Sequence, residues 1–396
     1  MTKTVPKSVP KTAIKIAEKP QHGGQIYQFA REKAAADNNN DMASIDSILD
    51  FSASINPIQP KIDWPLVNDN AQQALIHYPD SEQIALKQLL AKKFTLSYEQ
   101  ITLTNGISSA IMSLFSSFQP DNTLLITPIY SEYIRAAQLY SQQTFEFKVD
   151  KLEDLQPDHY LPYLKPLTEN SVIVLVNPST PLGLYFSPEK LNTFIQRLKE
   201  LNCWLWIDES FLPFIGVDAH LSFRKLLASH PKMLILQSLT KYYACPGLRI
   251  GALFSAANAL DSLPWPSWPI SVLDEQVLLQ ALTDGEHDSQ TIEFFNTETP
   301  RFIQCLQACS VIESVTETAA NFLFVQTQVS AGRLVKALKN FNILIRDCED
   351  FSLGTHSCRI AIRSTDDNNR LIDALQQCAI LLKEPESNLA HLNDLG

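Results

Sequence analysis

Short apolar runs and amphipathic stretches alternate along the chain from residue 101 onward. The runs are rich in β-branched and aromatic side chains, and the stretches between them, such as ISSAIMSLFSSF, repeat apolar residues with a helical period. This alternation is typical of strands that are buried on both faces of a mostly parallel sheet. The predicted strands are 101–104, 123–127, 144–149, 171–176, 204–208, 233–238 and 249–254.

The pattern changes past about residue 285. A long helical stretch is followed by apolar runs at 321–328, 343–347 and 359–364, with helical periods at 330–341 and 370–383. We therefore predict an α/β fold with two domains: a large domain over 61–284, whose mostly parallel central sheet is flanked by helices, and a smaller α+β C-terminal domain over 285–396. Residues 21–60 are predicted to be an N-terminal arm, and the Lys- and Pro-containing residues 1–20 a flexible tail.

The charge balance argues against a nucleic-acid binder. The chain has 43 acidic and 32 basic residues and a formal net charge of -11, whereas nucleic acid requires a basic face. An acidic substrate would have to be met by a local group of arginines. No apolar run approaches the roughly 20 residues of a membrane span, so no membrane partner is expected.

Cysteine and histidine spacing gives no sign of a disulfide framework or a metal site. The seven cysteines are an odd number without a CxxC pair, which predicts buried free thiols in a reducing compartment, and hence a cytoplasmic protein. The eight histidines form no HxH or HxxxH pair, so no metal is expected.

A lysine, Lys241, directly follows the predicted strand 233–238. A buried ammonium group is costly unless it is paired or neutralised, and desolvated lysines are the ones that form Schiff bases. Ser238 and Thr240 supply hydroxyls beside it, and Arg249 in PGLRIG can give a bidentate contact to a phosphate. Taken alone, this stretch also suits a surface lysine in a loop.

Three other predicted strands end in candidate ligand groups. Asp208 lies at a carboxyl end, where open α/β sheets place ligands and where a carboxylate can hold a heterocyclic nitrogen protonated; a helix N-cap is the alternative. The turn 104–109 offers backbone N–H groups and the Ser108 hydroxyl to a phosphate, although it also suits a simple turn. The stretch 177–183, with two prolines and a glycine, predicts a rigid turn.

Together these strand ends describe a lysine, an acid and a phosphate cradle that converge on one aromatic, phosphorylated aldehyde. Pyridoxal phosphate has this chemistry. The distribution of glycine supports a ligand site in these four stretches. The chain has only 11 glycines, and four of them lie there, where the backbone must turn tightly or approach a ligand closely: Gly106, Gly183, Gly247 and Gly251.

The sequence resembles the fold-type I aminotransferases, in the branch that contains histidinol-phosphate aminotransferases and the threonine-phosphate decarboxylases of cobalamin synthesis. The decarboxylases are the more similar of the two. The resemblance covers nearly the whole chain apart from the tail, and SLTK with PGLRIG is its most specific part. The stretches that carry it are HGG (22–24), DFSASINP (50–57), HYPD (77–80), TPIYSEY (127–133), DESF (208–211), SLTKYYACPGLRIG (238–251) and RIAIRS (359–364).

The resemblance implies a role for each matching residue. Lys241 would carry the cofactor and shuttle the proton, and Asp208 would hold the pyridine nitrogen. Tyr133 would stack on the ring, with Tyr130 as the alternative, and Thr180 would lie beside the phenolic oxygen. The implied phosphate ligands are Ser238, Arg249, Ser108 and the amide of Ile107, and Thr240 is also expected to contact the cofactor.

The resemblance also implies a homodimer with shared sites, because Tyr78 would reach the phosphate of the neighbouring subunit's cofactor. On the substrate side, Arg359 would take the carboxylate, and Arg346, His22 and Asn56 would lie near the substrate. The N-terminal arm would contribute to the substrate site through His22 and Asn56.

Two positions depart from the family pattern. The family's NPTG turn reads Thr180-Pro181-Leu182-Gly183 here, so a threonine replaces the asparagine that donates to the phenolic oxygen. Phe211 replaces the tyrosine that many aminotransferases carry three residues after the aspartate, and in this the chain resembles the decarboxylases.

The favoured hypothesis is a lyase that decarboxylates L-threonine O-3-phosphate to (R)-1-aminopropan-2-ol O-phosphate in cobalamin biosynthesis. The first alternative is an aminotransferase of a phosphorylated amino compound such as histidinol phosphate. A non-catalytic pyridoxal-phosphate-binding protein is the second, suggested only by Thr180 and Leu182.

Overall fold

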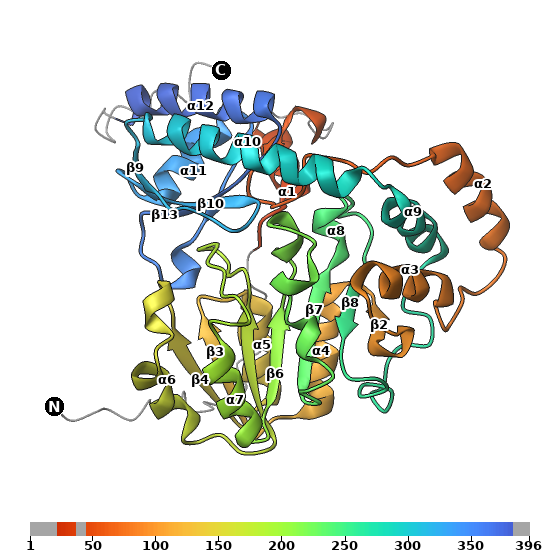
Figure 1. The fold of residues 1–396 in the computed structure, drawn as a ribbon. Coiled ribbons are helices and arrows are strands. Elements are labelled where there is room, and N and C mark those ends of the chain that lie inside the picture. The colour runs from red at the N-terminus through yellow and green to blue at the C-terminus, as the bar shows by residue number, and fades with distance from the viewer. Residues whose placement is uncertain (1–21, 37–44, 383–396) are drawn as a thin grey trace. The chain divides into compact units, whose positions relative to one another are not determined.

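A computed structural model describes residues 22–36 and 45–382 of the chain, apart from the side chain of Leu152 (Figure 1). These residues divide into two compact units. The large unit holds residues 58–292, and the small unit holds the described residues before 58 together with those from 293 onward.

The large unit is built on a seven-stranded sheet with the order β2-β8-β7-β6-β5-β3-β4. The pairs β3–β4, β3–β5, β5–β6 and β6–β7 are parallel, whereas β8 runs antiparallel to both β2 and β7. The sheet is therefore mostly parallel, as predicted. Its strands are β2 (Ile101–Thr104), β3 (Asn122–Thr127), β4 (Gln143–Lys148), β5 (Ser171–Val176), β6 (Trp204–Asp208), β7 (Met233–Ser238) and β8 (Gly251–Phe254).

Helices lie on both faces of this sheet; in Figure 1, α7 lies in front of it and α4 and α5 lie behind it. The helices of the large unit are α2 (Trp64–Ala74), α3 (Ile84–Phe94), α4 (Gly106–Phe118), α5 (Ser131–Tyr140), α6 (Pro157–Leu164), α7 (Asn192–Glu200), α8 (Leu239–Tyr242) and α9 (Val272–Thr283). Helix α10 (His287–Gln307) begins in the large unit and continues in the small one.

Helix α4 packs against one face of the sheet through apolar residues that recur with the helical period. Its residues Ile107, Ala110, Ile111, Leu114 and Phe115 are buried, and they share one cluster with residues of α5 and with alternate residues of β5, β6 and β7. Strands β3, β5 and β7 are buried along their whole length, as expected of strands covered on both faces. Their positions, and those of their carboxyl ends, are set by packing in the core.

The small unit contains a four-stranded antiparallel sheet, β12-β13-β10-β9, and a separate parallel pair, β1–β11. Its strands are β1 (Leu49–Asp50), β9 (Ile312–Val315), β10 (Phe322–Thr327), β11 (Ile343–Leu344), β12 (Arg346–Asp347) and β13 (Ser357–Ala361). Its remaining helices are α1 (Ile26–Ala36), α11 (Ala331–Lys339) and α12 (Thr365–Leu381). The predicted fold class, a large α/β domain with a smaller α+β domain, is confirmed.

Local differences from the sequence-based elements have simple causes. The run 343–347 forms two strands instead of one, because β11 pairs with β1 and β12 pairs with β13. Strand β8 begins at Gly251, so Arg249 precedes the strand instead of lying in it. Within the described residues, no helix is both long enough and apolar enough to cross a membrane.

Candidate active site

The predicted site residues of the large unit gather at one edge of its sheet. Strands β3, β5, β6 and β7 are parallel, and β2 has the same direction because β8 is antiparallel to both β2 and β7. The carboxyl ends of these five strands therefore meet at one edge, where open α/β sheets bind ligands. The segments with Ser108, Tyr130, Thr180, Asp208 and Lys241 follow or end these strands.

Asp208, the last residue of β6, is buried with both carboxylate oxygens bound. It lies on the same face as Trp206, toward α4 and α5, because side chains two apart on a strand share a face. The Tyr133 hydroxyl donates to Oδ2 at 2.9 Å, and the Ser210 amide donates to Oδ1 at 2.9 Å. These bonds hold the carboxylate in one orientation.

Lys241 lies on α8, a single helical turn that directly follows β7, and its side chain is half-buried. Its ammonium nitrogen is 5.0 Å from the centroid of the Phe211 ring. At the start of this turn the hydroxyls of Ser238 and Thr240 are 3.2 Å apart, and the Ser238 amide donates to Ser210 Oγ at 2.8 Å. Ser210 thus connects the aspartate of β6 to the segment that carries the lysine.

A cradle with the features of a phosphate site forms where α4 begins. Gly106 has φ +71°, and a Cβ there would lie 2.9 Å from Nη2 of Arg249, so a side chain at this position would crowd the guanidinium. A Cβ at Gly251 would meet the backbone nitrogen of Ile107 at 3.0 Å. The two glycines therefore leave room around the N–H groups of α4 and the exposed Arg249, the donors that anions use at a helix N-terminus.

Tyr130 closes this cradle on the side of α5. Its hydroxyl is 3.1 Å from Ser108 Oγ, and burial raises the pKa of Tyr130.

The loop that carries Thr180 is held in place by the side chain of Asn177. This side chain accepts from the amide of Phe186 at 2.8 Å and donates to its carbonyl at 2.9 Å. Thr180 itself is buried.

The predicted substrate residues of the small unit lie on the β12–β13 pair and in the segment around Ser52. Arg359 on β13 donates from Nη2 to Ser52 O at 2.9 Å, and burial lowers the pKa of Arg359 to about 10. The Gly24 amide, two residues from His22, donates to Ser52 Oγ at 2.9 Å. Asn56, four residues after Ser52, is buried. Arg346 lies opposite Arg359 across the β12–β13 pair.

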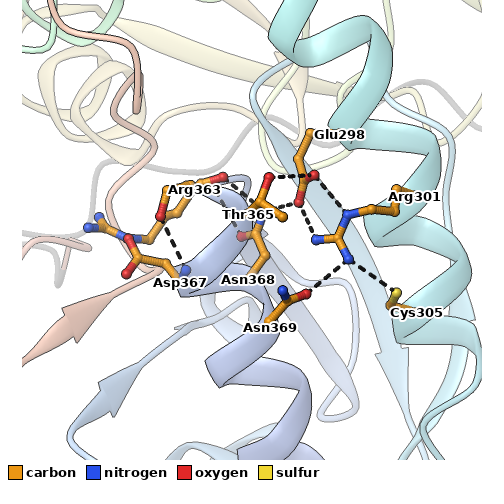
Figure 2. A network of polar contacts seen from close by, with 9 residues as sticks. Glu298, Arg301, Cys305, Arg363, Thr365, Asp367, Asn368 and Asn369 are labelled. Atoms are coloured by element: carbon orange, nitrogen blue, oxygen red, sulfur yellow. Dashed lines mark hydrogen bonds and ion pairs between the residues drawn. The ribbon is translucent and has the colours of Figure 1, made fainter.

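A polar network supports the end of β13 and the start of α12 (Figure 2). The buried Glu298 of α10 accepts from Arg301, Thr365 and Asn368. Asn368 in turn bonds both the amide and the carbonyl of Arg363, at 3.0 and 2.8 Å. The segment after Arg359 is thus held by side chains of two helices.

The geometry combines an amine, an oriented carboxylate and an anion cradle at one edge of the large sheet. The described residues contain no group of three or more His, Cys, Asp and Glu side chains that could hold a metal ion.

The family model described as "Aminotransferase class I and II" matches residues 46–375. The chain belongs to the class I and II aminotransferase family. Pyridoxal phosphate is its cofactor. The resemblance seen in the sequence is confirmed.

Individual relatives of this aminotransferase-family chain have two different activities. It is 30% identical to a threonine-phosphate decarboxylase of Salmonella typhimurium, over 90% of this chain and 95% of that protein. It superposes on a histidinol-phosphate aminotransferase from Clostridium acetobutylicum with a TM-score of 0.75 and 25% identity, over 84% of this chain and 99% of that one. A histidinol-phosphate aminotransferase from Sinorhizobium meliloti in complex with pyridoxal 5'-phosphate has a TM-score of 0.70 and 21% identity, over 83% and 90% of the two chains.

The residues at the sheet edge fit pyridoxal phosphate. The cradle at Gly106, Gly251 and Arg249 suits its phosphate, since side chains at the two glycines would crowd Arg249 and the Ile107 amide. A buried carboxylate held by two donors suits a protonated ring nitrogen, and the amine of Lys241 suits the aldehyde. Gly247 differs from Gly106 and Gly251, because a Cβ at Gly247 would meet nothing within 4 Å.

The structure separates the two tyrosines considered for ring stacking in this aminotransferase-family site. Tyr133 is fully buried, packs in the apolar cluster behind the sheet, and uses its hydroxyl on Asp208. Tyr130 is only partly buried and contacts Ser108 in the cradle. Tyr130 therefore lies at the cradle, whereas Tyr133 lies behind the sheet with its hydroxyl on Asp208.

Tyr133→Phe is expected to lower turnover by about tenfold to a hundredfold, the effect of losing a hydrogen bond to a buried charged group worth about 1.5–3 kcal/mol. The ring and its packing are kept, so the protein should still fold, with a melting temperature lower by only a few degrees for the lost bond. Tyr160→Phe, at a buried tyrosine packed against Phe194 on α7, is the matched control and should keep full turnover. Unchanged turnover in Tyr133→Phe would show that the Ser210 amide alone orients Asp208.

Sequence reasoning named Asp208 and Lys241 but missed the residues that fix them. Ser210 lies within the quoted DESF stretch, yet its bridging role depends on the parallel register of β6 and β7. Arg224 also escaped prediction, although its guanidinium is buried and donates to Gln237 at 2.7 Å, one residue before Ser238. No spacing in the sequence marks either contact.

Proposed function

We propose that the protein is a pyridoxal-phosphate-dependent lyase that decarboxylates L-threonine O-3-phosphate to (R)-1-aminopropan-2-ol O-phosphate, as part of cobalamin biosynthesis. The observation that carries the proposal is the pair Arg346 and Arg359, opposite each other on β12 and β13. Two guanidinium groups suit a substrate with two anionic groups, a carboxylate and a phosphate. The 30% identity to a threonine-phosphate decarboxylase over nearly the full length of both chains supports the same activity.

The residues of the large unit take the following roles in this proposal. Lys241 would hold the cofactor through its aldehyde, and its amine would carry a proton to or from the substrate Cα. Asp208, oriented by Tyr133 and Ser210, keeps the ring nitrogen protonated. The cofactor, when bound, accepts the electron pair of the bond that breaks at Cα. Its phosphate is assigned to Ser108, the Ile107 amide, Ser238, Thr240 and Arg249.

The residues of the small unit decide which bond breaks. The cofactor would serve as an electron sink for either bond at Cα, so the way in which the small unit holds the substrate carboxylate would select between loss of CO2 and loss of the Cα proton. We assign the carboxylate to Arg359, and the phosphate to Arg346 with His22 and Asn56 nearby. The structural likeness to a histidinol-phosphate aminotransferase supports transamination as the second candidate.

One assay distinguishes these activities. The purified holoenzyme is incubated with L-threonine O-3-phosphate, with and without 2-oxoglutarate, and CO2 and the amino product are measured. Release of CO2 without the keto acid is the expected result. Turnover that requires 2-oxoglutarate, or that occurs only with histidinol phosphate, would establish the aminotransferase, and cofactor binding without turnover of any of these compounds would indicate a non-catalytic protein.

Exposed apolar side chains on the large unit support a homodimer. Tyr78 is 79% exposed and stacks on Trp268 with ring centroids 4.4 Å apart, and Leu75 and Ile76 beside it are also exposed. Exposed apolar groups of this size mark protein interfaces. We propose that a second copy of the chain covers them and that Tyr78 reaches the partner's cofactor phosphate; light scattering of the purified protein tests the dimer.

A cytoplasmic location is also proposed. All seven cysteines are free thiols, five of them buried. Burial raises the pKa of Cys203 to about 11 and of Cys348 to about 12, so these thiols stay protonated and unreactive near neutral pH. Free thiols of this kind suit a reducing compartment.

Thr180→Asn is expected to lower the apparent pKa of the nitrogen that joins Lys241 to the cofactor, by about half to one unit. A longer amide donor would bind the phenolic oxygen more strongly and compete with the hydrogen bond from that nitrogen, at a net gain of about 0.5–1.5 kcal/mol. A spectrophotometric pH titration of the bound cofactor measures the change. Identical titration curves for wild type and variant would remove Thr180 from the cofactor contacts.

A further inference from the structure

Two arginines of the small unit lie side by side on neighbouring strands. Arg346 and Arg359 are directly opposite in the antiparallel β12–β13 register, so their side chains project from the same face. Arg359 is the more buried one and donates to Ser52 O. The positive charge of Arg346 adds to burial in lowering the pKa of Arg359. Adjacent guanidinium groups of this kind attract an anion.

An acidic side chain of the protein itself already contacts one of the two arginines. Asp350 Oδ2 accepts from Arg346 Nη2 at 2.6 Å, while Arg346 Nη1 donates to Asp347 O, also at 2.6 Å. The Arg346 side chain is only 12% exposed, whereas that of Asp350 is 41% exposed. The guanidinium is therefore fixed in place, and its carboxylate partner is open to solvent on one side.

The position of Asp350 in the fold makes it a displaceable partner. It lies on a short 3-10 helix, Glu349–Phe351, within the connection between β12 and β13, and not on a strand of the sheet. Two other acidic groups near the pair already accept hydrogen bonds elsewhere: Asp50 Oδ1 accepts from the amide of Ser52 at 2.8 Å and from its hydroxyl, and Asp347 Oδ1 accepts from the Glu349 amide at 2.9 Å. Asp350 is thus the carboxylate that an incoming anion would have to replace on Arg346.

We propose that Asp350 is a specificity-determining residue, an internal competitor that occupies Arg346 and weakens its affinity for the phosphate group of the substrate and of the product. The inference rests on the proposed function, in which Arg346 binds that phosphate. A substrate without a phosphate group leaves the Arg346–Asp350 pair intact, whereas a phosphorylated substrate must break it. Asp350 therefore lowers the preference for phosphorylated substrates and speeds release of the phosphorylated product.

The test compares wild-type holoenzyme with Asp350→Asn, which keeps the shape of the side chain and removes its charge. We expect the KM for L-threonine O-3-phosphate and the inhibition constant of inorganic phosphate to fall together, by about three- to tenfold, as for the loss of one competing, partly exposed ion pair. The KM for unphosphorylated L-threonine should not change. Glu349→Gln removes the same charge one residue away and controls for general electrostatics.

Calorimetric titration of the holoenzyme with inorganic phosphate gives a second readout that needs no turnover. Tighter binding to Asp350→Asn than to wild type and Glu349→Gln supports the proposal. Equal or weaker binding to Asp350→Asn overturns it and makes Asp350 a residue that merely holds Arg346 in position. If Arg346→Met leaves phosphate binding unchanged, the assignment of Arg346 in the proposed function fails instead, so the two failures are distinguishable.

Discussion

Lys241→Ala is expected to abolish turnover, with a loss of about a thousandfold or more. The variant lacks both the amine that binds the cofactor aldehyde and the base that moves the Cα proton, and general acid–base catalysis alone contributes about 10²–10⁴-fold. Because Lys241 is half-buried on a single helical turn, removing its side chain should leave the melting temperature almost unchanged. Product formation from L-threonine O-3-phosphate, with the enzyme saturated in pyridoxal phosphate, measures the loss.

Lys232→Ala is the matched control for this experiment. Lys232 precedes the opposite end of the same strand, β7, and donates to the carbonyls of Glu169 and Asn202 at 3.1 and 2.8 Å. This variant also loses a lysine, but far from the sheet edge that carries the site, and should keep its turnover. Activity of Lys241→Ala within tenfold of wild type would refute the assignment of Lys241 as the catalytic lysine.

The sequence was sufficient to predict the large sheet and the positions of its chemistry. Strands such as 171–176 and 233–238 are buried on both faces and therefore appear as continuous apolar runs. Polar residues at the ends of such runs, such as Asp208 and Lys241, have little structural reason to be there, so their chemistry was visible before the fold was known.

Contacts between segments distant in the chain could not be predicted. The division of 343–347 into two strands depends on β1, a two-residue strand about 300 positions earlier. The hydrogen bond from Tyr133 to Asp208 spans 75 residues and depends on how α5 packs behind the sheet. Motif spacing identified both Tyr130 and Tyr133, and only packing distinguished their surroundings.

The buried network around Arg224 is the second feature with a large expected effect. Glu209, next to Asp208 on the chain, is fully buried and accepts from the Ser222 hydroxyl at 2.6 Å and the Phe223 amide at 2.7 Å. Arg224 lies 3.8 Å from Glu209 and donates to Gln237 on β7. Its guanidinium also lies over the rings of Phe94 and Phe254, with centroid distances of 4.0 and 5.0 Å. The network connects the strand ends that carry Asp208 and Ser238.

Arg224→Met is expected to lower the free energy of unfolding by about 3–5 kcal/mol, because it leaves the Glu209 carboxylate buried without its positive partner. The double variant Glu209→Gln/Arg224→Met removes both charges and should recover most of this loss, since neutral replacements of a buried ion pair are often well tolerated. Denaturant unfolding of the wild type, both single variants and the double variant measures the free energies of unfolding, and this double-mutant cycle gives the coupling energy between Glu209 and Arg224.

The free energy of unfolding that Arg224→Met loses should increase with pH. Burial already raises the pKa of Glu209 above its usual value of 4.5, and Arg224 opposes that rise, so the variant raises it further. A carboxyl group whose pKa is raised by folding stabilises the fold fully below its unfolded pKa, and this contribution is lost as the pH rises. The loss of stability should therefore be larger at pH 8 than at pH 5. A deficit that is constant over this range, or that persists undiminished in the double variant, would mean that Arg224 acts through its packing on Phe94 and Phe254 and not through its charge.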